Sequence, residues 1–127
     1  MIEEIKPDKI ILAVGSYFSK PDIEGVEGEK VITAKAILLG LEKVGERVAV
    51  IGGGLVGAEV ADFLSSRKHQ VTIFEMLPEL AHKAATSTKV YLTDQLARRN
   101  VQVICQAKVL KVAPAKVCYI REGWRFT

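Results

Sequence analysis

The middle of the chain contains three short apolar runs separated by two segments of helical character. The runs cover residues 48–51 (VAVI), 71–75 (VTIFE) and 101–105 (VQVIC), and apolar runs of this length are typical of buried strands. The intervening segments repeat apolar residues at helical spacing, beginning with Val56, Val60, Phe63 and Leu64. The order strand, helix, strand, helix, strand predicts a parallel β-α-β-α-β unit.

The two helices have recognisable ends. The first is expected from Leu55 onward, and the second from Thr86 or Ser87 to about residue 99. Basic residues in the segment SSRKHQ suit the negative C-terminal end of the first helix. Asn100 is expected to end the second helix in the left-handed conformation.

The flanking segments follow other patterns. Residues 8–16 (DKIILAVGS) predict a strand covered on both faces, and residues 17–30 predict an extended connector. Thr33 is expected to cap a short helix that ends at Gly40 or Gly45. After residue 106 the alternation of apolar and polar residues predicts antiparallel strands and a hairpin. Trp124 is expected to pack in this hairpin, with contact to a partner surface as the alternative.

These elements predict a three-layer α/β domain of Rossmann-like type. Its parallel sheet is expected on strands near Val48, Val71 and Val101, with a β-hairpin layer after Val109. A chain of 127 residues is about the length of one domain.

The turn between the first strand and the first helix contains a dinucleotide-binding fingerprint, Gly52-x-Gly54-x-x-Gly57. In this motif the first glycine allows a sharp turn, the second allows the backbone to approach a pyrophosphate, and the third allows the helix to pack closely. Gly53 receives no role from the pattern. The backbone N–H groups of residues 55–57, in the first helical turn, form an anion site together with the helix dipole.

Glu75 ends the second strand at the distance from the glycines where an acid accepts hydrogen bonds from the adenosine ribose. A carboxylate there repels a ribose 2′-phosphate, and Met76 and Leu77 supply no cation beside it. The sequence therefore favours NAD(H) over NADP(H), with Lys83 as the one residue that argues the other way. The expected cofactor-binding residues are Gly52, Gly53, Gly54, Leu55, Val56, Gly57, Glu59, Glu75 and Met76.

Three of these assignments have structural alternatives. The glycines of the strand-to-helix turn could serve packing alone. Glu59 either faces the nicotinamide end of the ligand or pairs with a surface base such as Arg67, and Glu75 could be a solvated strand end. His69 is expected to be a helix-end cation and His82 a surface loop residue. No set of residues resembles a catalytic triad, a carboxylate pair or a metal cluster, so we expect a binding domain without catalytic residues of its own.

Composition narrows the class further. The 18 Lys and Arg residues and 15 Asp and Glu residues are scattered, which does not indicate a nucleic-acid-binding face. No apolar run reaches the roughly 18–20 residues of a membrane span, and the N-terminus does not resemble a signal peptide. We expect a cytoplasmic protein without a membrane partner, in which Cys105 and Cys118 are buried apolar side chains.

Five segments, in this order, resemble one group of flavoproteins: IILAVGS, VITAKAILLG, VAVIGGGLVGAEVADFL, VTIFEMLPELA and LARRNVQV. They are similar to the nicotinamide-nucleotide region of the 2-enoate reductase and 2,4-dienoyl-CoA reductase family of NADH:flavin oxidoreductases. Over most of the chain, the resemblance implies a domain of the type found in flavoproteins with two dinucleotide-binding domains. In ILAVGS, Val14 stands where the family has threonine.

The resemblance implies a larger parent protein. Such proteins contain an FMN barrel, an iron–sulfur cluster and a pair of domains that hold FAD and NAD(P)H, so FAD, FMN and the cluster are expected outside this chain. Residues 1–30 would be the end of the FAD-domain half and a connector, and residues 31–127 an NAD(H)-binding domain truncated at its C-terminal end. In the family, positions matching Glu59 and Glu75 lie at the nicotinamide and ribose ends of the ligand, respectively.

The implied function is delivery of hydride from NADH to FAD, for reduction of an activated C=C bond in the parent enzyme. The isolated chain is expected to bind nucleotide without turnover. Two alternatives stay open. The chain could be the nicotinamide domain of a disulfide-reductase or NADH-oxidase-type flavoprotein, or a non-catalytic nucleotide-sensing domain.

Overall fold

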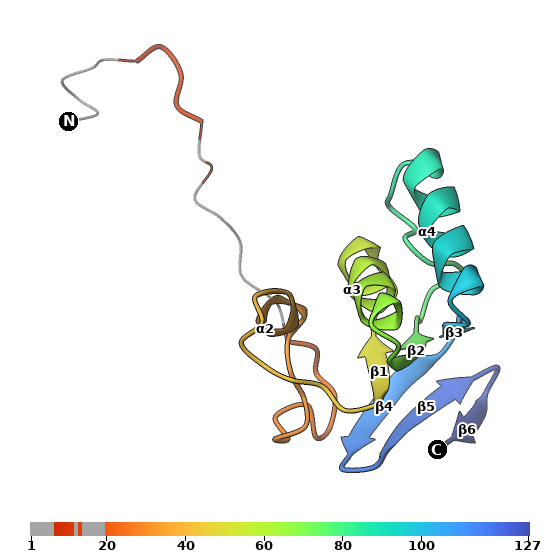
Figure 1. Ribbon diagram of the computed structural model, residues 1–127. Coiled ribbons are helices and arrows are strands. Elements are labelled where there is room, and N and C mark those ends of the chain that lie inside the picture. Colours follow the sequence, from red (N-terminus) through yellow and green to blue (C-terminus); the bar gives the residue numbers. More distant parts are fainter. Residues whose placement is uncertain (1–6, 12, 14–19) are drawn as a thin grey trace.

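The parallel sheet predicted for the middle of the chain is present, with the strand order β1-β2-β3. The computed structural model describes residues 7–11, 13 and 20–127 (Figure 1). β2 is central and pairs in parallel with both neighbours, so Ile73 lies between Val50 and Val103. The three strands span Arg47–Ile51, Gln70–Phe74 and Gln102–Ile104, in that order.

Two helices cover one face of this sheet. α3 spans Leu55–Ser66 and α4 spans Thr86–Arg98, and both lie on the same side of the strands (Figure 1). Because side chains alternate along a strand, Val71 and Ile73 of β2 share the face toward the helices. They form a core with apolar residues of both helices, namely Ala58, Val60, Ala61, Leu64, Leu92 and Leu96.

Both helices end in the same way. Asn100 follows α4 with φ = 56°, as predicted, and Lys68 follows α3 with φ = 69°, which was not predicted. The N–H groups that follow α3 donate to Ser65 and Leu64 carbonyls, and those that follow α4 donate to Ala97 and Leu96 carbonyls. These bonds satisfy carbonyl groups that a helix end otherwise leaves open.

An antiparallel sheet covers the opposite face. Its strands β4 (Lys108–Ala113), β5 (Lys116–Arg121) and β6 (Trp124–Phe126) are neighbours in chain order. Phe74 of β2 contacts Tyr119 of β5, with ring centroids 5.0 Å apart, in a second core with Ala107 and Val109. The predicted three-layer α/β fold is confirmed, and the outer layer extends the expected hairpin by a third strand (Figure 1).

The predicted short helix is also present. α2 spans Ala34–Leu38, and Thr33 Oγ1 accepts a hydrogen bond from Ala36 N at 3.2 Å. Gly40 follows the helix with φ = 68°, a conformation that glycine adopts without a steric penalty.

The prediction of an extended connector is wrong for residues 20–30. This segment is rich in turns and packs against the edge of β4, where Val112 N donates to Glu24 O at 2.8 Å. Gly25 has φ = 82°, and a side chain there would collide with the Val112 backbone. Ile23 joins the apolar cluster beneath the antiparallel sheet. Two contacts hold this polar segment against the sheet. Ile23 packs on apolar side chains, and the backbone of the edge strand β4 provides a hydrogen-bond donor to Glu24 O.

The predictions for the N-terminal strand and for Trp124 differ from the structure. Within the predicted strand 8–16, the described residues 8–11 and 13 are exposed and form no strand, whereas 12 and 14–16, with Val14, lie outside the described residues. A strand requires a neighbour for its backbone hydrogen bonds. Trp124 is 74% exposed, so its predicted packing role is wrong; Phe126 instead stacks on Tyr119.

Among the helices of the described residues, none has the length and apolar character to cross a membrane.

Candidate functional site

The turn from β1 to α3 has the geometry that the glycine pattern predicts. Gly52 has φ = 97°, which favours glycine, and its N–H donates to Phe74 O at 2.9 Å. A Cβ atom on Gly57 would lie 3.0 Å from the carbonyl carbon of Gly52 and closer still to its oxygen. A Cβ atom on Gly54 would meet no atom within 4 Å. The turn is therefore closed on the side of Gly57 and open on the side of Gly54.

The N-terminal end of α3 lies at this open side. Gly54 is the N-cap of α3. Among the described residues no side chain caps this helix, and the first turn of α3 contains no acidic residue. The first intrahelical bond runs from Ala58 N to Gly54 O at 2.9 Å. The N–H groups of Leu55, Val56 and Gly57 precede this bond and have no intrahelical acceptor. Together with the helix dipole they favour an anion.

Glu75 follows the last residue of β2 and is 6% exposed. Its two carboxylate oxygens accept hydrogen bonds from Gly53 N at 2.6 Å and from Leu77 N at 2.7 Å. Such bonds compensate for burial of the carboxylate. A carboxylate offers about four acceptor directions, so two stay available for a ligand. The alternative of a solvated strand end does not describe this buried side chain.

A cavity of about 330 Å³ connects these features. Of the residues expected to bind the cofactor, four line it: Gly53, Gly54, Leu55 and Glu75. The structure therefore brings the glycine turn, the start of α3 and the end of β2 together around one cavity. This is the edge of a parallel α/β sheet, at the carboxyl ends of the strands, where ligands bind.

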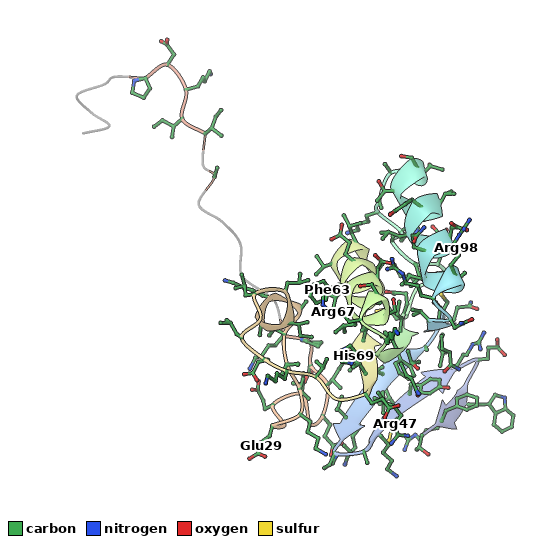
Figure 2. The ribbon with its side chains drawn as sticks, viewed as in Figure 1. Glu29, Arg47, Phe63, Arg67, His69 and Arg98 are labelled. Atoms are coloured by element: carbon green, nitrogen blue, oxygen red, sulfur yellow. The ribbon has the colours of Figure 1, made fainter. Side chains whose placement is uncertain are left out.

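The remaining expected residues lie around this cavity without lining it. Gly52 and Gly57 shape the turn, Val56 is 48% exposed and Met76 is 65% exposed. Glu59 is exposed and has no ion-pair partner among the described residues. Its suggested partner Arg67 instead lies over the Phe63 ring, 3.6 Å from the centroid (Figure 2).

Five lining residues were not expected to bind the cofactor. All belong to the loop between β2 and α4: Leu77, Glu79, His82, Lys83 and Ala84. The signal was available, because the residues after Glu75 must leave the same sheet edge as the glycine turn. His82 is on the surface, as expected, and also contributes to the cavity wall.

Glu79 organises the polar part of this wall. Its Oε1 accepts hydrogen bonds from Lys89 Nζ at 2.8 Å and is 2.9 Å from His82 Nδ1. The hydrogen bonds with Lys89 and His82 lower the pKa of Glu79. The wall therefore combines an ionised carboxylate with nearby basic groups at neutral pH.

The two cysteines are half-buried, less than the full burial expected from the sequence. Cys105 follows β3 directly. Burial and the negative charge of Glu75 raise the pKa of its thiol. A raised pKa keeps Cys105 in its unreactive thiol form at neutral pH.

The sequence matches the pyridine nucleotide-disulphide oxidoreductase family over residues 2–123. The NADH oxidase of Thermoanaerobacter brockii is 33% identical over 96% of the chain and 20% of its own length. The cinnamate reductase of Clostridium sporogenes is 44% identical over 59% of the chain and 11% of its own length. The structure of a 2-naphthoyl-CoA reductase complex superimposes with a TM-score of 0.86 over 99% of the chain and 19% of that protein, at 23% identity.

The chain spans only 11% to 37% of the length of the curated relatives it matches. Members of the matching family are NAD(P)H-dependent flavin oxidoreductases that bind NAD(H) and FAD. The family match covers nearly the whole chain, and the glycine turn and Glu75 lie within it. The chain thus belongs to the pyridine nucleotide-disulphide oxidoreductase family.

Proposed function

We propose that this chain binds NADH at the cavity beside the glycine turn, as the nicotinamide-nucleotide domain of a larger flavoenzyme. The observation that carries the proposal is the convergence of two groups on one cavity. The open N–H groups at the start of α3 suit the pyrophosphate, and the Glu75 carboxylate suits the ribose hydroxyls.

The same carboxylate favours NADH over NADPH. Glu75 lines the cavity, and its negative charge repels a ribose 2′-phosphate. Lys83 also lines the cavity, and its positive charge would attract a ribose 2′-phosphate. Because the buried carboxylate is fixed by two backbone N–H groups, whereas Lys83 is exposed, we expect the effect of the carboxylate to dominate.

Calorimetric titration of the 127-residue chain with NADH and with NADPH tests this proposal. We expect saturable NADH binding in the micromolar to millimolar range and weaker NADPH binding. Absence of NADH binding at millimolar concentration contradicts the proposed site. Tighter binding of NADPH contradicts the role of Glu75 and leaves the glycine turn as the anion site.

For the parent enzyme we propose a 2-enoate-reductase-type reaction. In such an enzyme FAD, an iron–sulfur cluster and FMN, all held outside this chain, would carry the two electrons of the NADH hydride to an activated C=C bond, which would take up two protons. The resemblance of the sequence segments and the 44% identity with a cinnamate reductase support this reaction. Residues 1–30 would then close the FAD-domain half, and residues 31–127 would form the NAD(H) domain.

An oxidase or disulfide-reductase reaction is the second candidate, because the similarity to an NADH oxidase extends over 96% of the chain. Assays of the full-length protein with NADH separate the candidates. Anaerobic consumption of NADH with a 2-enoate supports the first. Consumption only with oxygen or with a disulfide supports the second and contradicts the first.

A further inference from the structure

The loop after β2, residues 76–85, is attached to the glycine turn through Gly53. Gly53 N donates to Glu75 Oε2 at 2.6 Å, and Gly53 O accepts from Ala81 N at 2.7 Å. The other oxygen of Glu75 accepts from Leu77 N at 2.7 Å. Gly53 and Glu75 thus tie the turn to the opposite wall of the cavity by three hydrogen bonds.

Packing reinforces this attachment. A Cβ atom on Gly53 would lie 3.0 Å from Glu75 Cβ and 3.2 Å from Ile73 Cγ2, and would overlap the Leu80 side chain. Leu80 and Ala81 are 7% and 2% exposed. The neighbouring Gly54 is the opposite case, since a Cβ atom there would meet no atom within 4 Å. A side chain at position 53 would therefore point into the protein, whereas a side chain at position 54 would meet open space.

We propose that Gly53 is a positioning residue of the nucleotide site, which acts through Leu80 and Glu75. This inference rests on the proposed function. The absence of a side chain at position 53 lets Leu80 seat the loop against the turn, and the Gly53 N–H fixes the carboxylate that receives the ribose. A methyl group would push the loop outward and move Glu75 from its place, while the anion site at the start of α3 stays intact.

The test uses Gly53→Ala in the 127-residue chain. We expect the NADH Kd to rise about tenfold, as an overpacked contact displaces the wall of the site. Amide hydrogen exchange at Leu77 and Ala81 should accelerate by about the same factor, because their acceptors belong to Glu75 and Gly53. Gly54→Ala is the matched control. It should weaken NADH binding by obstruction and leave exchange at Leu77 and Ala81 unchanged.

A double-mutant cycle with Leu80→Ala separates positioning from general damage. Shortening Leu80 removes the overlap with Leu80 and leaves only the contacts with Glu75 Cβ and Ile73 Cγ2, so the effect of Gly53→Ala on the NADH Kd should fall clearly below tenfold. A tenfold loss in both backgrounds contradicts action through Leu80. Unchanged exchange at Leu77 and Ala81 in Gly53→Ala overturns the inference even if the wild-type chain binds NADH. Absence of NADH binding by the wild type contradicts the proposed function instead, and the exchange data still decide whether Gly53 positions the loop.

Discussion

The two ends of the parallel sheet each contain a cavity, and the larger one lies away from the glycine turn. The cavity at the carboxyl ends of the strands measures about 330 Å³, and the one at their amino ends about 540 Å³. The amino-end cavity contains cationic residues and no acidic residue. Its lining comprises Ser65, Lys68, His69, Gln70, Val71, Thr72, Arg99, Asn100 and Gln102.

Volume and basic side chains alone would favour the amino-end cavity as an anion site, but the helix dipoles disfavour an anion there. α3 and α4 both end there, so the negative ends of two helix dipoles point toward it. The cations at this end compensate those dipoles, and the left-handed residues Lys68 and Asn100 close the helices. At the carboxyl end, α3 begins with open N–H groups. Backbone polarity therefore supports the proposed phosphate site at the carboxyl ends of the strands, although the cavity there is the smaller of the two.

The strongest test of this assignment replaces one glycine by alanine at each end of the parallel sheet. In Gly57→Ala the new Cβ collides with the Gly52 backbone, which cannot move without distorting the turn. We expect the free energy of unfolding to fall by about 2–3 kcal/mol and NADH affinity to fall more than about 100-fold. Urea unfolding and calorimetry measure the two effects.

Gly45→Ala is the control at the amino end. A Cβ atom on Gly45 would meet no atom within 4 Å. We expect the stability to change by less than about 1 kcal/mol, with unaltered NADH affinity. Comparable loss of NADH binding in Gly45→Ala contradicts the assignment of the ligand to the carboxyl end.

Glu75→Ala should have the next largest effect. It removes the acceptor for the Gly53 and Leu77 N–H groups and the proposed acceptor for the ribose. We expect NADH affinity to fall about 30-fold, with a smaller loss for NADPH because repulsion of the 2′-phosphate also disappears. The ratio of the two Kd values should therefore narrow. Glu46→Ala, at the amino end, should leave the ratio unchanged, and an unchanged ratio in Glu75→Ala contradicts the ribose role.

Local sequence signals predicted much of the structure at the two ends of the parallel sheet. The start of α4 at Thr86, the left-handed conformations of Asn100 and Gly52 and the close contact between Gly57 and Gly52 all follow from nearby residues. The close approach of Gly53 to Leu80 could not be predicted in this way, because the two residues lie far apart in the sequence.

The same limit explains the error in the segment 20–30. Its contact with β4 joins Glu24 to the backbone at residues 111 and 112, and no local pattern encodes such a pairing. The sequence places the loop after Glu75 at the same sheet edge as the glycine turn. Which of its residues line the cavity depends again on a non-local contact, the hydrogen bond from Ala81 N to Gly53 O.

Arg99→Ala tests the amino end with a smaller effect. Arg99 forms an ion pair with Asp62 and donates to Asp62 O at 3.0 Å, with both side chains partly buried. We expect a loss of about 1 kcal/mol in the free energy of unfolding. NADH affinity should stay within about twofold of the wild type, since the contacts are remote from the glycine turn. A clear loss of NADH affinity would instead assign the amino-end cavity a role in nucleotide binding.

The smallest expected effect concerns the pH dependence of stability that arises from Glu79, in the wall of the cavity at the carboxyl ends of the strands. Lys89 and His82 lower the pKa of Glu79 below its ordinary value of 4.5. A lowered pKa in the folded state means that the contribution of Glu79 to stability is present above about pH 4.5 and is lost as the pH falls below it. The melting temperature of Glu79→Gln, measured from pH 6 to pH 3, should therefore approach that of the wild type at the acid end. Because Glu79 is exposed, the difference at pH 6 should be small. A difference between the two proteins that grows toward pH 3 contradicts the assigned ion pairs.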